Sequence, residues 1–182
     1  MTIPTILTYL RIALIPIFVL FFYLPTSWAN IAATAIFSLA AITDWFDGYL
    51  ARRLNQTSAF GAFLDPVADK LMVAAALILI VQATPTIWIA IPAMIIIGRE
   101  IAVSALREWM AELGQSAQVA VSMLGKIKTT AQITSLILLI YHEPLLGMPI
   151  ELLGIIALYI AAALTLWSMA IYLQNAWPSM KD

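Results

Sequence analysis

Residues 30–52 of the chain read NIAATAIFSLAAITDWFDGYLAR, an apolar run that ends in two aspartates and an arginine. A helix needs roughly 20 apolar residues to cross a bilayer, and this run is long enough. Five more apolar runs of similar length cover residues 6–24, 60–83, 86–110, 119–141 and 150–174. The sequence therefore predicts an all-α integral membrane protein, a bundle of six transmembrane helices.

The composition excludes a soluble domain. Of the 182 residues, 63% are hydrophobic and only 10% are charged, which is too little polar surface for a water-soluble fold. No internal repeat or long linker divides the chain, so we expect a single membrane domain over residues 1–182. The absence of cysteine excludes disulfides and thiol catalysis.

The basic residues indicate the orientation of the six spans. In a six-span arrangement all of them fall on one side, and the opposite loops near residues 25–29, 84–86 and 142–149 contain none. An excess of Lys and Arg marks the cytoplasmic side of a membrane protein. We therefore expect a multi-pass protein of the bacterial cytoplasmic (inner) membrane with both termini in the cytoplasm. The residues are Arg11, Arg52, Arg53, Lys70, Arg99, Arg107, Lys126, Lys128 and Lys181.

Four aspartates recur at helical spacing on this same side. Positions at i, i+3, i+4 and i+7, or at i, i+4 and i+8, share one face of a helix. The polar residues 52–58 between the two sets are expected to form a turn at the water interface, so the two helices should meet with their acid faces toward each other. The first set is Asp44, Asp47, Gly48 and Ala51, and the second is Gly61, Asp65 and Asp69.

These carboxylates call for a positive partner, because one at the centre of a membrane helix costs about 2.5–3.5 kcal/mol on insertion scales. Oxygen ligands with no Cys or His nearby favour Mg²⁺ or Mn²⁺ over Zn²⁺. The small residues on the same faces would let a ligand approach the backbone. The alternative interpretation is a solvated turn in which the carboxylates merely avoid lipid.

The spacing also forms a longer motif, Asp-x2-Asp-Gly-x2-Ala-Arg-x8-Gly-x3-Asp-x3-Asp, which the chain matches from Asp44 to Asp69 without a departure. The motif resembles that of the CDP-alcohol phosphotransferase family. Further segments are similar to the bacterial members of that family that make phosphatidylglycerophosphate, and the similarity covers essentially the whole chain. These segments are residues 3–11, Gly98-Arg99-Glu100, residues 104–108 and residues 125–129.

The resemblance implies transfer of a phosphatidyl group from CDP-diacylglycerol to sn-glycerol 3-phosphate with release of CMP, at an active site facing the cytoplasm. It implies two divalent ions, membrane lipid as surroundings, a homodimer and no nucleic-acid partner. Asp44, Asp47 and Asp65 would hold one ion, and Asp69 would contribute to the second. Asp69 also resembles the family's general base. Gly48, Ala51 and Gly61 would let the cytidine nucleotide approach, and Arg52 would pair with phosphate.

A basic cluster is the expected site for the phosphate of the acceptor. Arg and Lys both bind phosphate, Arg through a planar fork of donors and Lys as a point charge. The alternative is that these residues only set the orientation and pair with Glu100, Glu108 or Glu112. The cluster consists of Arg99, Arg107, Lys126 and Lys128.

Two residues of the first span, Thr8 and Arg11, lie one helical turn apart and are expected to line the nucleotide pocket. Arg11 has the alternative of extending its charged end to the membrane surface.

Three other functions remain open on chemistry alone. The acceptor of the same transfer could be an inositol phosphate, serine or phosphatidylglycerol, of which the basic cluster favours the phosphorylated one. A membrane prenyltransferase also binds a lipid pyrophosphate through aspartates and Mg²⁺, but it is expected to carry a second acid-rich motif. A divalent-cation transporter would need polar groups across the whole membrane, and the opposite half of this chain is almost purely apolar.

Overall fold

The computed structural model describes residues 3–54, 59–112 and 123–176, which form six helices and no strand. Within these ranges the side chains of residues 3–4, 45, 47–54, 59, 62, 123–124, 126 and 175–176 are not described. An apolar helix is found at each of the six predicted runs. The helices are α1 (Ile3–Phe22), α2 (Ala29–Leu54), α3 (Ala59–Ala83), α4 (Ile87–Glu112), α5 (Met123–Tyr141) and α6 (Ile150–Ala176).

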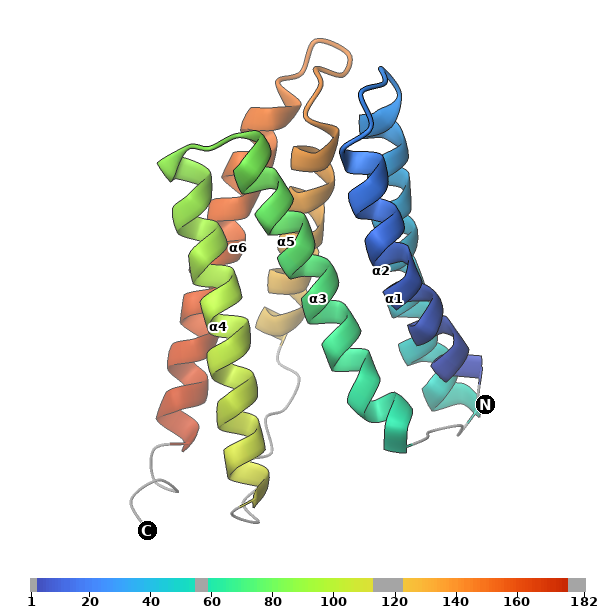
Figure 1. The fold of residues 1–182 in the computed structure, drawn as a ribbon. Coiled ribbons are helices and arrows are strands. Elements are labelled where there is room, and N and C mark those ends of the chain that lie inside the picture. Colours follow the sequence, from blue (N-terminus) through green and yellow to red (C-terminus); the bar gives the residue numbers. More distant parts are fainter. Residues whose placement is uncertain (1–2, 55–58, 113–122, 177–182) are drawn as a thin grey trace.

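Successive helices run in opposite directions through the bundle (Figure 1). The starts of α1, α3 and α5 therefore lie at the same end as the last turns of α2, α4 and α6. The most extensive packing joins α5 to α6 and α1 to α2, while α3 contacts α1, α4 and α5. Three helices in the described part of the chain are long and apolar enough to cross a membrane, within Thr5–Phe22, Ile87–Glu112 and Ile150–Gln174.

An apolar core joins the helices through the middle of the bundle. Phe18 of α1 and Phe37 of α2 are buried, with their ring centroids 5.8 Å apart. Leu77, Leu136 and Leu158 bring α3, α5 and α6 into the same cluster. Burial of a large apolar side chain is worth about 1.5–3 kcal/mol, so this cluster fixes how the helices meet.

The predicted turn at residues 52–58 is wrong for its first three residues. Arg52, Arg53 and Leu54 are the last residues of α2 rather than part of a turn. The prediction weighed their polarity, whereas Arg and Leu are among the better helix formers and nothing in the sequence breaks the helix before them. Residues 55–58 and the predicted start of the fifth run, residues 119–122, lie outside the described residues.

Candidate active site

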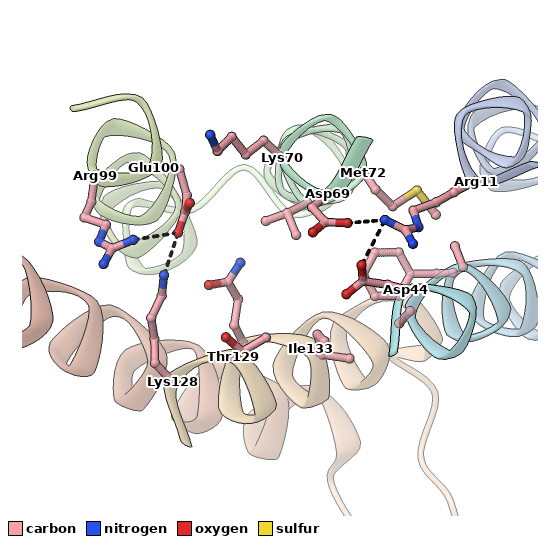
Figure 2. A pocket seen from close by; sticks show the side chains of 15 residues that line it. Arg11, Asp44, Asp69, Lys70, Met72, Arg99, Glu100, Lys128, Thr129 and Ile133 are labelled. Carbon is pink, nitrogen blue, oxygen red and sulfur yellow. Dashed lines mark hydrogen bonds and ion pairs between the residues drawn. The ribbon is translucent and has the colours of Figure 1, made fainter. Parts of the chain in front are cut away.

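A cavity of about 230 Å³ opens among α1, α2, α3, α4 and α5. Its charged side chains form two groups on opposite sides, as Figure 2 shows. We call Arg11, Asp44 and Asp69 the acid end. We call Arg99, Glu100 and Lys128 the basic end. Lys70 of α3 lies between the two ends in this view.

The acid end is built around a buried arginine of α1. The side chain of Arg11 is 1% exposed, and its Nη1 lies 2.9 Å from Oδ1 of Asp44 on α2. The same guanidinium forms an ion pair with Asp69 on α3. Both carboxylates remain partly open, at 39% and 44% exposure. One cation thus joins carboxylates from two different helices.

The neighbouring turn of α1 adds a third contact to the aspartates. Thr8, which is completely buried, donates a hydrogen bond to the carboxylate of Asp65. The expectation that the acid faces of α2 and α3 meet directly was therefore incomplete, because α1 packs against both helices and contributes the contacts. Thr8 and Arg11 were expected beside the nucleotide, and in the structure they contact the aspartates.

The acid end has the donor chemistry that a hard divalent cation requires. Asp44 and Asp69 line the cavity and already converge on one cationic atom, Nη1 of Arg11. Their carboxylate oxygens are ligands that Mg²⁺ and Mn²⁺ prefer. Among the described side chains, no three His, Cys, Asp or Glu residues form a ready-made metal cluster. The side chain of Asp47, the fourth predicted ligand, lies outside the described residues.

The basic end has the opposite arrangement of charges. Nζ of Lys128 donates a hydrogen bond to Oε1 of Glu100 at 2.5 Å, and Nη1 of Arg99 donates to the same oxygen at 3.2 Å. Nη2 of Arg99 donates to Oγ of Ser168 on α6 at 3.1 Å. The two cations are nearly enclosed, with side chains 13% and 9% exposed. Cations from α4 and α5 therefore converge on one carboxylate.

Arg107 does not join this group, contrary to the predicted four-residue cluster. It is exposed, its Cζ lies 5.7 Å from the ring centroid of Tyr172, and it is not among the residues lining the cavity. Arg107 lies eight positions after Arg99, which is about 12 Å along a helix. Lys126 belongs to α5, but its side chain lies outside the described residues.

The remaining predicted site residues belong to parts of α2 and α3 in which few side chains are described. Helix α2 continues through Asp47, Gly48, Ala51 and Arg52, so their spacing along one helix is as expected, while their side chains lie outside the described residues. Gly61 is buried in the first turn of α3.

Four polar residues that the prediction did not assign to the site also line the cavity: Glu100, Lys70, Thr129 and Gln132. Glu100 had a detectable signal, because a carboxylate inside an apolar helix usually has a specific partner. The sequence offered Glu100 only as an alternative ion-pair partner, and that pairing is present. Nothing in the sequence distinguished Gln132 from other polar residues of α5.

Known proteins are similar to this chain over nearly its full length. A sequence model described as CDP-alcohol phosphatidyltransferase matches residues 1–167. Proteins named CDP-diacylglycerol--glycerol-3-phosphate 3-phosphatidyltransferase from Escherichia coli (strain K12) and Shigella flexneri serotype 5b are each 53% identical over 180 residues, covering 99% of this chain and 97% of their own. A protein of the same name from Pectobacterium atrosepticum is 57% identical over 174 residues, covering 96% of this chain and 94% of its own.

Proposed function

The chain belongs to the CDP-alcohol phosphatidyltransferase family, and we propose that it transfers a phosphatidyl group from CDP-diacylglycerol to sn-glycerol 3-phosphate. The products are phosphatidylglycerophosphate and CMP. Similarity to relatives that carry the corresponding name supports this, and it extends over nearly all of both chains. The observation that carries the proposal is that one cavity has carboxylates at one end and enclosed cations at the other.

The enzyme is proposed to be a single membrane domain of six spans in the bacterial inner membrane. The helices alternate in direction, and three of those described have the length and apolar character of a membrane span. The bias of Lys and Arg toward one side supports cytoplasmic termini and a cavity that opens to the cytoplasm. Homodimer formation is an expectation from the family resemblance, and chemical cross-linking in membranes would test it.

Two divalent ions, Mg²⁺ or Mn²⁺, are proposed to bind at the acid end through Asp44, Asp47, Asp65 and Asp69. Bound there, they would supply the positive charge that balances the pyrophosphate of CDP-diacylglycerol and the leaving phosphate of CMP. Arg11, buried beside Asp44 and Asp69, adds a fixed positive charge to the same region. Gly48, Ala51 and Gly61 are proposed to leave room for the cytidine nucleotide, and Arg52 to pair with its phosphate.

Asp69 is proposed to act as the general base. Its carboxylate lines the cavity and is 44% exposed, so an incoming hydroxyl can reach it. It would take the proton of a glycerol hydroxyl while that oxygen forms a bond to the phosphatidyl phosphorus. The bond from this phosphorus to the oxygen of CMP breaks, and CMP leaves with the electron pair.

The basic end is proposed to bind the phosphate of the acceptor through Arg99 and Lys128. Two nearly enclosed cations favour a phosphorylated acceptor over serine or another uncharged alcohol, because charge-assisted hydrogen bonds to phosphate are strong. With the phosphate held there, the rest of the acceptor extends through the cavity toward Asp69. Arg107 and Lys126 remain predicted contributors from the sequence.

The test is CMP release by the purified protein in detergent with CDP-diacylglycerol and Mg²⁺. Glycerol 3-phosphate, inositol phosphate, serine and phosphatidylglycerol are compared as acceptors, with Asp69→Asn as the inactive control. We expect turnover with glycerol 3-phosphate. Turnover only with serine or phosphatidylglycerol would refute the assignment of the basic end, and turnover only with inositol phosphate would refute glycerol 3-phosphate as the acceptor. Release with none of them would refute the transferase itself.

A further inference from the structure

We propose that Glu100 is a positioning residue of the basic end, whose carboxylate holds the Arg99 guanidinium and the Lys128 ammonium group where both bind the acceptor phosphate. The inference rests on the proposed function, since it gives Glu100 a role within that phosphate site. Glu100 acts through the two cations and not by touching the reacting atoms.

The contacts meet at a single atom. Oε1 of Glu100 accepts a hydrogen bond from Arg99, its neighbour on α4, and one from Lys128 on α5. Ser168 of α6 accepts a hydrogen bond from the other terminal nitrogen of Arg99. A guanidinium fixed at both terminal nitrogens cannot rotate freely, and the shared oxygen sets the distance from it to the ammonium group. Glu100 therefore determines the spacing of two cations that come from different helices.

The two cations need this carboxylate because they are close together and nearly enclosed. Like charges repel strongly where the effective dielectric constant is low, and a buried charge without a partner is costly. Lysine has a flexible four-carbon stem, so Lys128 could turn away from Arg99. The carboxylate counters the repulsion and keeps the ammonium group in the cavity before any phosphate has bound.

Enough hydrogen-bonding capacity is left over for a ligand. An ammonium group has three N–H donors and a guanidinium has five. The contacts with Glu100 and Ser168 use one donor of Lys128 and two of Arg99. Nε of Arg99 is buried and has no hydrogen-bond partner among the described residues. Phosphate can therefore bind both cations while Glu100 stays in place.

The decisive variant is Glu100→Gln, which keeps the shape of the side chain and removes its charge. Glu108→Gln is the matched control, since Glu108 is an exposed carboxylate on the same helix and is not among the residues lining the cavity. Steady-state kinetics in detergent give kcat and a KM for each substrate. We expect the KM for glycerol 3-phosphate to rise about 10- to 100-fold in Glu100→Gln, the effect of weakening hydrogen bonds between charged groups.

The KM for CDP-diacylglycerol and kcat at saturating acceptor should stay near the wild-type values, and Glu108→Gln should match the wild type throughout. An unaltered KM for glycerol 3-phosphate would overturn the proposal. An equal rise in both KM values would also overturn it, because it would indicate general damage to the fold. If Glu100→Gln does not fold, Glu100→Asp is judged by the same criteria, since it keeps the charge and shortens the side chain.

Failure of this inference can be distinguished from failure of the proposed function. If Arg99→Gln and Lys128→Gln leave the KM for glycerol 3-phosphate unaltered, the phosphate site itself is wrong. If these two variants raise that KM and Glu100→Gln does not, the phosphate site stands and only the role of Glu100 is refuted.

Discussion

The two ends of the cavity have opposite arrangements of charge. At the acid end one buried arginine contacts two carboxylates that are 39% and 44% exposed, whereas at the basic end one carboxylate contacts two cations that are 13% and 9% exposed. The more open carboxylates can exchange their partner for an ion from solution. The enclosed cations, tied to α4, α5 and α6, are suited to binding a group of fixed shape. Under the proposed function, the acid end is therefore suited to the chemical step and the basic end to recognition of the acceptor.

Removal of divalent ions should reduce activity more than any substitution. The effect should be confined to the acid end of the cavity. We expect CMP release to fall to background in EDTA and to return with Mg²⁺ or Mn²⁺, because neutralisation of the pyrophosphate depends on these ions. Binding of inorganic phosphate to the basic end, measured by calorimetry, should be retained in EDTA. Full turnover in EDTA would refute the metal proposal.

Replacement of the proposed general base, Asp69, should have the second-largest effect on activity. Asp69→Asn is expected to slow CMP release by about 10²- to 10⁴-fold, the usual contribution of a general base. Its KM for glycerol 3-phosphate should remain near the wild-type value, because the basic end is intact. Glu151→Gln, on an exposed residue in the first turn of α6, is the control for loss of a carboxylate. Near-normal turnover in Asp69→Asn would exclude this residue as the base.

Substitutions of the cations should separate the members of the basic end from their neighbours. Arg99→Gln and Lys128→Gln are each expected to raise the KM for glycerol 3-phosphate about 10- to 100-fold, through the loss of charge-assisted hydrogen bonds. Arg107→Gln should change it much less, because Arg107 lies over Tyr172 and does not line the cavity. A comparable loss in all three variants would restore the larger cluster predicted from the sequence.

The smallest expected effect is on stability, from loss of the hydrogen bond that Thr8 donates to Asp65. Thr8→Val keeps the shape of the side chain and removes the hydrogen bond to Asp65. We expect the free energy of unfolding to fall by about 0.5–1.5 kcal/mol, the usual net value of such a bond. Thermal unfolding in detergent measures this, with Thr26→Val at an exposed loop position as the control. A variant as stable as the control would show that this bond adds nothing.

The positions of the helices could be predicted well because each one coincides with an apolar run of the sequence, and three of those described are long and apolar enough to cross a membrane. The polar residues after Ala51 were predicted less well. Their polarity suggested a turn, yet α2 continues to Leu54. Hydropathy indicates where a chain leaves an apolar environment, but it does not determine where the backbone stops being helical.

The members of the site were easier to predict than their partners. Periodicity places residues on one face of one helix, which was sufficient to group the aspartates. It carries no information about which helices pack together, so the contacts of Arg11 with Asp44 and Asp69 could not be read from the sequence. The same limit explains why Arg107 was grouped with Arg99, although about two helical turns separate them along α4.

The salt bridges of Arg11 bear on how the chain is assembled. Its guanidinium is a counter-ion built into the first helix, and it contacts carboxylates of the second and third helices, which follow it along the chain. The N-terminal half therefore holds its own compensating charge as soon as these three helices have come together. Membrane insertion and helix packing would in this way not depend on the supply of ions, and the proposed divalent ions would bind to the finished protein.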